Sequence, residues 1–196
     1  MNSICVFCGS SMGVKTAYRQ AANDLAMELL ERNIALIYGG ANVGLMKVLA
    51  DALLDGGGQV VGIMPKLLVE KEVAHLNLTK MYIVSNMSER KSMMVGMSDA
   101  FIAMPGGFGT LDELAEVITY NQLRLTDKPI GILNTAGYFD KLLAFFDHIT
   151  DEGFLRREHR QNLIVDDHIH QLLEKMSAYT PVAIDKWISD IKEESK

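Results

Sequence analysis

The chain has 196 residues, 48% of them hydrophobic, and a formal net charge of −6 at pH 7. This length and composition predict one domain with its own core, and the acidic balance argues against nucleic acid or an anionic membrane as a partner. No apolar run approaches the roughly 18 residues of a membrane span, and Cys5 and Cys8 cannot form a disulfide framework, so we expect a cytoplasmic protein.

Short apolar runs alternate with helical patterns along the whole chain. Strands are expected at residues 4–7, 35–38, 60–64, 81–84, 101–104, 130–133 and 163–165. Helices are expected at 18–30, 45–54, 87–98, 111–125, 138–152 and 168–179, with an ambiguous surface segment at 66–79. This order predicts an α/β, Rossmann-like, doubly wound fold with a mostly parallel sheet. We expect a single domain over residues 1–180 and a partly helical tail over 181–196.

Three glycine-rich segments, at residues 9–13, 39–44 and 106–109, follow predicted strands. Ligands of doubly wound sheets bind beyond the carboxyl ends of the strands, so all three segments are expected along one rim. Neither common nucleotide fingerprint fits, because G-x-G-x-x-G is absent after the first strand and Leu45 and Met46 follow Gly44 where a phosphate loop needs Lys and Ser or Thr. NAD and Mg-ATP are therefore disfavoured. Two interpretations of the glycine-rich segments stay open. Their backbone amides bind a mononucleotide, or the glycines only form ordinary tight turns.

The stretch P-G-G-F-G-T-L-D-E at residues 105–113 joins a buried strand to a helix. Its glycines allow a ligand to approach the backbone, and the first N–H groups of the helix can bind an anion. Glu113 comes one turn into this helix and is the better candidate for acid–base work, whereas Glu116 on the same face is expected to be structural. Asp112 favours the start of the helix.

Arg90 is the second candidate. It shares a helical stripe with Met87, Met94 and Met97, and a charged side chain at a core-facing position needs a partner. That partner is expected to be a carboxylate or a bound phosphate, unless Arg90 forms only a structural ion pair at a helix edge. Metal binding is not expected, because His168 and His170 have no companion ligands in sequence.

Four motifs together resemble the Lonely Guy (LOG) family of cytokinin-activating phosphoribohydrolases. They are P-G-G-x-G-T-x-x-E at 105–113, M-x-E-R-K at 87–91, C-x-F-C-G-S-S at 5–11, and a Y-G-G segment at 38–47 in which Ala41 and Lys47 replace glycines of the family pattern. The resemblance implies a homodimer that hydrolyses the N-glycosidic bond of N6-modified adenosine 5′-monophosphates without a metal or organic cofactor. Family members often carry a lysine decarboxylase label, but nothing in this sequence marks a Schiff-base lysine.

The resemblance assigns catalysis to Arg90 and Glu113. The candidate substrate-binding residues are Gly9, Ser10, Glu72, Arg90, Lys91, Gly107, Phe108, Gly109, Thr110, Leu111, Asp112, Glu113 and Thr119. We expect the 5′-phosphate on the amides of residues 107–110 and Glu113 beside an oxocarbenium-like ribosyl cation, with Arg90 positioning the nucleotide or stabilising charge. The alternatives are an AMP nucleosidase that uses plain AMP and a nucleotide-binding protein without catalysis.

Overall fold

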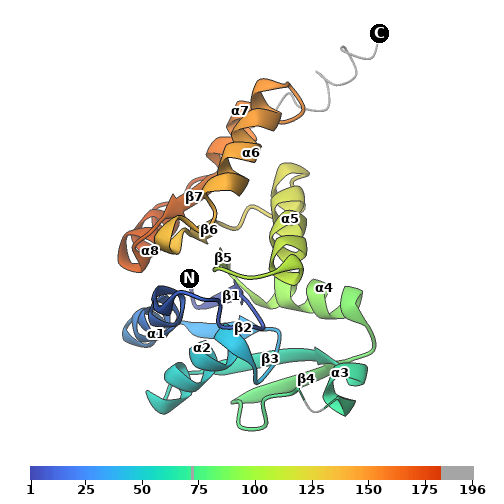
Figure 1. Cartoon of the computed structure of the whole chain (residues 1–196). Coiled ribbons are helices and arrows are strands. Elements are labelled where there is room, and N and C mark those ends of the chain that lie inside the picture. Colours follow the sequence, from blue (N-terminus) through green and yellow to red (C-terminus); the bar gives the residue numbers. More distant parts are fainter. Residues whose placement is uncertain (72, 182–196) are drawn as a thin grey trace.

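The computed structural model describes residues 1–71 and 73–181. Its centre is a seven-stranded parallel sheet with the order β4-β3-β2-β1-β5-β6-β7 (Figure 1). The strands are β1 (Ser3–Phe7), β2 (Ala35–Tyr38), β3 (Val60–Pro65), β4 (Lys80–Val84), β5 (Ala100–Ala103), β6 (Ile130–Leu133) and β7 (Leu163–Asp166). The predicted doubly wound α/β fold is confirmed.

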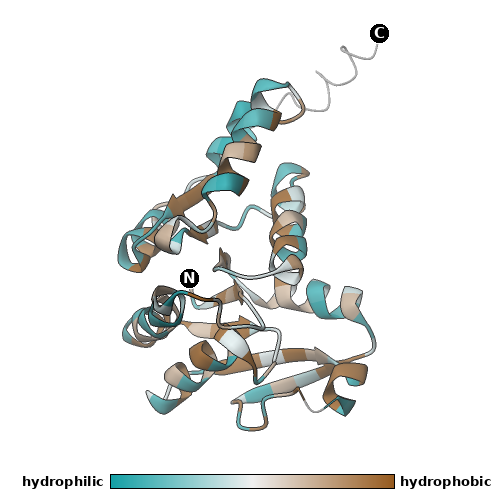
Figure 2. Ribbon diagram, in the orientation of Figure 1, coloured by the Kyte–Doolittle hydropathy of each residue, from teal (hydrophilic) through white to brown (hydrophobic). Residues whose placement is uncertain are grey.

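Helices cover both faces of the sheet, as Figures 1 and 2 show. One face packs against α1 (Thr16–Glu31), α2 (Gly44–Asp55) and α8 (Ile169–Ser177), and the other against α4 (Met87–Met97), α5 (Phe108–Gln122) and α6 (Asp140–Asp151). Side chains of β1 alternate between the two cores, so Ile4 faces the α1 side and Cys5 the α4 side. Cys8 lies in the core on the α1 side, which confirms that the two cysteines point to opposite faces.

Several local predictions differ from the structure. Helix α5 begins at Phe108, earlier than expected, because Gly107 in an extended conformation is its N-cap. The short helices α3 (Lys66–Glu70) and α7 (Arg157–Gln161), and the 3-10 turn η1 (Thr135–Gly137), were not predicted. They are too short to show a helical repeat of apolar residues.

The predicted apolar stripe of α4 is wrong in part. Met94 is buried, but Met87, the first residue of the helix, is 44% exposed, as residues at a helix end often are. The predicted tail lies outside the described residues apart from Pro181. Within the described residues, none of the helices combines the length and the apolar character that crossing a membrane requires.

The order of the strands creates a topological switch beside β1. The chain passes from β1 through β2 and β3 to β4 at one edge, then returns to the other side of β1 with β5. The loops after β1 and β5 consequently leave the sheet in different directions at neighbouring carboxyl ends. In open α/β sheets this is the place where ligands bind.

Candidate active site

The three glycine-rich segments meet at this rim. The N–H of Gly9, after β1, donates to the carbonyl of Pro105, after β5, over 3.0 Å. The N–H of Leu45, at the start of α2, donates to the carbonyl of Gly9, also over 3.0 Å. The expected juxtaposition of the three segments is therefore confirmed, and main-chain hydrogen bonds maintain it.

A cavity of about 220 Å³ opens above the switch point. Its walls are residues 9–13, residues 105–107, Tyr18, Leu45 and Tyr138. The Tyr138 hydroxyl donates to the Gly106 carbonyl, and its ring makes an edge contact with Tyr18 at 5.6 Å between centroids.

Sequence reasoning missed both tyrosines. Tyr138 follows β6, whose carboxyl end lies at the same rim, after a turn in which Ala136 and Gly137 have positive φ of 54° and 70°. The available signal was thus a Gly-containing turn directly after a buried strand. Residues 138–152 had instead been assigned to one helix.

The start of α5 offers unpaired backbone donors. The first helical hydrogen bond runs from Leu111 N–H to the Gly107 carbonyl, so the N–H groups of Phe108, Gly109 and Thr110 precede the helical ladder. Such a terminus attracts an anion through these donors and the helix dipole.

The glycines around this terminus serve different purposes. A Cβ on Gly106 would overlap Thr110 Oγ1 and lie 2.9 Å from Gly9 N, so Gly106 is required by packing. A Cβ on Gly107 or Gly109 would meet nothing within 4 Å, and neither residue has positive φ. Packing therefore does not explain these two glycines, whereas an open approach to the amides does.

Arg90 and Glu113 form an ion pair between α4 and α5. Arg90 Nη1 lies 3.4 Å from Glu113 Oε1, and each side chain is only 11% exposed. Arg90 Nε also donates to the Ile63 carbonyl of β3 over 3.0 Å. Arg90 therefore has a carboxylate partner and a carbonyl acceptor, as a desolvated guanidinium group requires.

The environment of Glu113 brings its ionisation close to neutrality. Burial raises the pKa of Glu113 to about 7; the Arg90 guanidinium opposes this rise, and Asp112 adds to it. A carboxyl group with this pKa changes its protonation state near physiological pH, as general acids and bases in enzymes often do.

Lys91 lies beside this pair and contacts two other acids. Its Nζ is 3.2 Å from Asp112 and 3.4 Å from Glu116, which also accepts a hydrogen bond from the Tyr120 hydroxyl. Burial lowers the pKa of Lys91, but the two carboxylates raise it more, so the net pKa lies above the ordinary value. Lys91 is therefore held as an ammonium ion.

The remaining candidate residues are more dispersed. Phe108 is 90% exposed at the start of α5, and Leu111 is half-buried in the first turn. Thr119 is exposed farther along α5, where its hydroxyl donates to the Ala115 carbonyl of its own helix. Of the candidate residues, Gly9, Ser10 and Gly107 line the cavity, whereas Thr119, Arg90, Lys91 and residues 108–113 do not. Glu72 lies outside the described residues.

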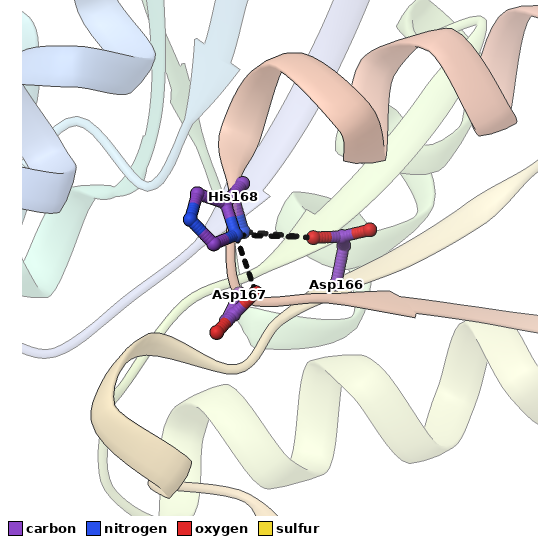
Figure 3. Close-up of side chains that lie close together, drawn as sticks. All are labelled: Asp166, Asp167 and His168. Carbon is purple, nitrogen blue, oxygen red and sulfur yellow. Dashed lines mark hydrogen bonds and ion pairs between the residues drawn. The ribbon is translucent and has the colours of Figure 1, made fainter.

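A second hollow, of about 400 Å³, lies between α1 and the start of α8. Asp166, Asp167 and His168 lie close together beside it (Figure 3). Asp166 accepts from the His168 N–H over 2.9 Å and pairs with Lys175 at 2.6 Å, so its carboxylate supports the start of α8. The smaller cavity is the better candidate site because it adjoins unpaired amides at the switch point.

Comparisons with known proteins agree with this geometry. Residues 46–176 match the model of a family described as possible lysine decarboxylase. The chain is 49% identical over 177 residues to a probable cytokinin riboside 5′-monophosphate phosphoribohydrolase of Oryza sativa subsp. japonica, covering 90% of this chain and 79% of that protein. It is 47% identical over 178 residues to a cytokinin riboside 5′-monophosphate phosphoribohydrolase of Arabidopsis thaliana, covering 91% and 83%.

Among solved structures, the molybdenum cofactor binding protein of Rippkaea orientalis has a TM-score of 0.68 at 20% identity, covering 90% of this chain and 95% of that one. A molybdenum cofactor carrier protein of Chlamydomonas reinhardtii has a TM-score of 0.66 at 17% identity, covering 90% and 98%. At these identities the likeness concerns the fold alone.

Proposed function

The chain belongs to the LOG family of phosphoribohydrolases, and we propose that it hydrolyses the N-glycosidic bond of N6-modified adenosine 5′-monophosphates. The products are the free base and ribose 5-phosphate, which amounts to cytokinin activation. The observation that carries the proposal is Glu113, a buried carboxyl group with a pKa of about 7, paired with Arg90 and one turn from the unpaired amides of α5.

In the proposed reaction the 5′-phosphate binds the N–H groups of residues 108–110 and the Gly107 backbone. The bond between the anomeric carbon and the base nitrogen breaks, and its electron pair leaves with the base. Ionised Glu113 stabilises the resulting oxocarbenium-like charge and accepts a proton from the attacking water, whose oxygen bonds to the anomeric carbon. That proton then passes from Glu113 to the departing base, which neutralises the base and restores the carboxylate. Arg90 positions the nucleotide and opposes the rise in the pKa of Glu113, which favours the ionised carboxylate.

Lysine decarboxylation, which the description of the matching family names, fits the site poorly. A lysine that forms a Schiff base must be available as a neutral amine. Lys91 lies beside the Arg90–Glu113 pair, and its contacts with Asp112 and Glu116 raise its pKa above the ordinary value. These carboxylates favour the ammonium form, and we assign Lys91 to substrate binding.

The proposal includes a cytoplasmic homodimer. Large apolar side chains are exposed at the start of α4 (Met87), at the start of α5 (Phe108) and just after the end of α5 (Leu123 and Leu125), and such residues often lie at subunit interfaces. Light scattering coupled to gel filtration should give about twice the 21.7 kDa of one chain. A mass of one chain at micromolar concentration would refute the dimer without bearing on the reaction.

The decisive experiment incubates the purified protein with isopentenyladenosine monophosphate, AMP, GMP and CMP, followed by chromatography of the products. We expect equal amounts of free base and ribose 5-phosphate from the prenylated nucleotide and slow or no reaction of the matching nucleoside. Faster release from plain AMP would instead identify an AMP nucleosidase. Nucleotide binding in calorimetry without any product would identify a non-catalytic binding protein.

Two variants test the roles of the ion pair. Glu113→Gln and Arg90→Ala should each lower turnover by roughly 10² to 10⁴, the usual contribution of a group that takes part in proton transfer or charge stabilisation. Circular dichroism should remain that of the wild type. Turnover near the wild-type rate in either variant would remove that residue from the reaction.

A further inference from the structure

The second glycine-rich segment has no role in the reaction described above. It follows β2, and its first residue is Gly39, which is buried. The chain does not need a glycine there for backbone reasons, because Gly39 is not among the residues with positive φ. Gly40 and Gly44 differ from it, with φ of 78° and 56°.

The space beside Gly39 is occupied by Arg90. A Cβ at Gly39 would overlap Nη2 of Arg90 and lie 3.0 Å from its Cζ and 3.5 Å from its Nε, so its three nearest neighbours all belong to this one side chain. Side chains alternate along β2, and Ile37 belongs to the core on the α4 side. A side chain two residues later, at Gly39, would point toward the same face and therefore toward α4.

Arg90 is consequently fixed on three sides. Its Nε donates to the Ile63 carbonyl, its Nη1 faces Glu113, and its Nη2 lies over the bare backbone of Gly39. The guanidinium group is planar and rigid, so a shift of Nη2 away from Gly39 would also move Nε relative to Ile63 and Nη1 relative to Glu113. The β2–β3 register ends with the pair Tyr38 and Gly62, and continuing it by one residue would place Gly39 opposite Ile63.

We propose that Gly39 is a positioning residue, which by lacking a side chain admits the Arg90 guanidinium to its place against Glu113. In this proposal Gly39 makes room for a guanidinium group, and the phosphate binds at the loop after β5. The inference rests on the proposed function for its consequences in catalysis, but the placement of Arg90 can be tested without any substrate.

The substitution Gly39→Ala tests this directly, since the three atoms nearest to the added methyl all belong to the end of the Arg90 side chain and none to the backbone. Gly96→Ala is the matched control: Gly96 lies on the same helix as Arg90, and a Cβ there meets nothing within 4 Å. We expect Gly39→Ala to lower kcat at least tenfold with an unchanged circular dichroism spectrum. Gly96→Ala should retain wild-type turnover.

A double-mutant cycle separates positioning from a general structural effect. Arg90→Lys removes the guanidinium group that the new methyl displaces, so adding Gly39→Ala to Arg90→Lys should cause no further loss of kcat. Losses that multiply in the double variant would overturn the proposal. So would wild-type turnover in Gly39→Ala.

Carboxyl ¹³C NMR of the substrate-free protein, with Glu113→Gln to assign the signal, gives a second readout. Displacing Arg90 should raise the pKa of Glu113, because the guanidinium opposes the effect of burial. The other ionisable groups that act on Glu113 are Asp112 and Glu116 on α5, Lys91 on α4, and the thiols Cys5 and Cys8, and all are unchanged in Gly39→Ala. An unchanged pKa would refute the positioning role even if the protein proved inactive on every nucleotide.

Discussion

At the scale of single residues, the chemistry depends on the protonation state of Glu113. Burial raises its pKa to about 7, and the proposed mechanism requires the ionised form. We therefore expect kcat/KM to rise with pH through about 7 and to level off above it, because kcat/KM reports ionisation in the free enzyme. Initial rates between pH 5 and 9 would check this. A rate that falls from pH 6 to pH 8 would indicate that protonated Glu113 is the active form.

The ionisation of Glu113 should raise kcat/KM as the pH increases but should lower the stability of the fold. The pKa of Glu113 is higher in the folded state than its ordinary value of 4.5, so the native protein binds more protons than the unfolded chain between about pH 4.5 and 7. Stability from this group falls as pH rises through that window, by roughly 3 kcal/mol in all.

Glu113→Gln cannot ionise and should lack this decline. Its melting temperature relative to the wild type should therefore increase by several degrees between pH 4.5 and pH 8, a shift accessible to calorimetry. The effect of Arg90 is already part of the pKa of Glu113, and exchanging a neutral carboxyl group for an amide adds only an offset that is the same at every pH in this range. A difference in melting temperature that stays constant across the range would contradict the raised pKa.

Sequence reasoning found Arg90 and Glu113 because both are locally anomalous. A charge among apolar positions and an acid directly after a glycine loop are visible in a single helix or turn. Gly39 and Tyr138 were missed because their roles come from groups distant in sequence, the tip of Arg90 and the Gly106 carbonyl. Met87 was misassigned because helical periodicity gives a direction but does not say where the helix meets the sheet.

At the scale of elements, two glycine substitutions at the start of α5 should distinguish an effect on packing from an effect on nucleotide binding. Gly106→Ala places a methyl against Thr110 and Gly9, so we expect a lower melting temperature. Gly107→Ala places it in open space, where the phosphate is proposed to lie, so we expect an unchanged melting temperature and a KM for the nucleotide raised at least tenfold. Calorimetric titration with AMP would check the affinity. Equal effects of both substitutions on stability would refute the distinction.

The turn before α6 supports that same terminus through Tyr138. Because the peptide unit is planar, a hydroxyl that holds the Gly106 carbonyl also fixes the direction of the next N–H, that of Gly107. Tyr138→Phe should therefore raise KM about fivefold, the equivalent of one net hydrogen bond of about 1 kcal/mol, and leave kcat nearly unchanged. Tyr82→Phe, on the edge strand β4, is the control. A loss confined to kcat would contradict a role in phosphate binding.

Element types were predicted well because parallel strands that are buried on both faces produce continuous apolar runs. The start of α5 was misplaced because Gly107 caps the helix through its extended backbone, which no side-chain pattern reveals. Residues 66–79 were ambiguous for a related reason. Their contact with the β2 loop, through the Ala41–Ala74 bridge, is long-range and leaves no periodic signal.

At the scale of the whole molecule, the order of the strands was not predicted, although it is what places the site. Alternation of strands and helices predicts a parallel sheet but not which strand lies beside which. The return of the chain to β5 on the far side of β1 brings residues 9–13 and 105–107 together. The rim was nevertheless predicted correctly, because all carboxyl ends of a parallel sheet lie at the same edge.

The sheet divides the interior into two separate cores, and this division has a measurable consequence. Leu49 on α2 and Ile132 on β6 are fully buried in different cores, on opposite faces. Leu49→Ala and Ile132→Ala should each lower the free energy of unfolding by about 2–5 kcal/mol. Because the two side chains belong to core clusters that have no residue in common, the double variant should lose the sum within about 0.5 kcal/mol. Leu76→Ala, at an 89% exposed position, is the control for denaturant titration. A double variant that loses much less than the sum would mean that the two cores are coupled. In that case a substitution far from the rim could also displace the loops after β1 and β5 that form the site.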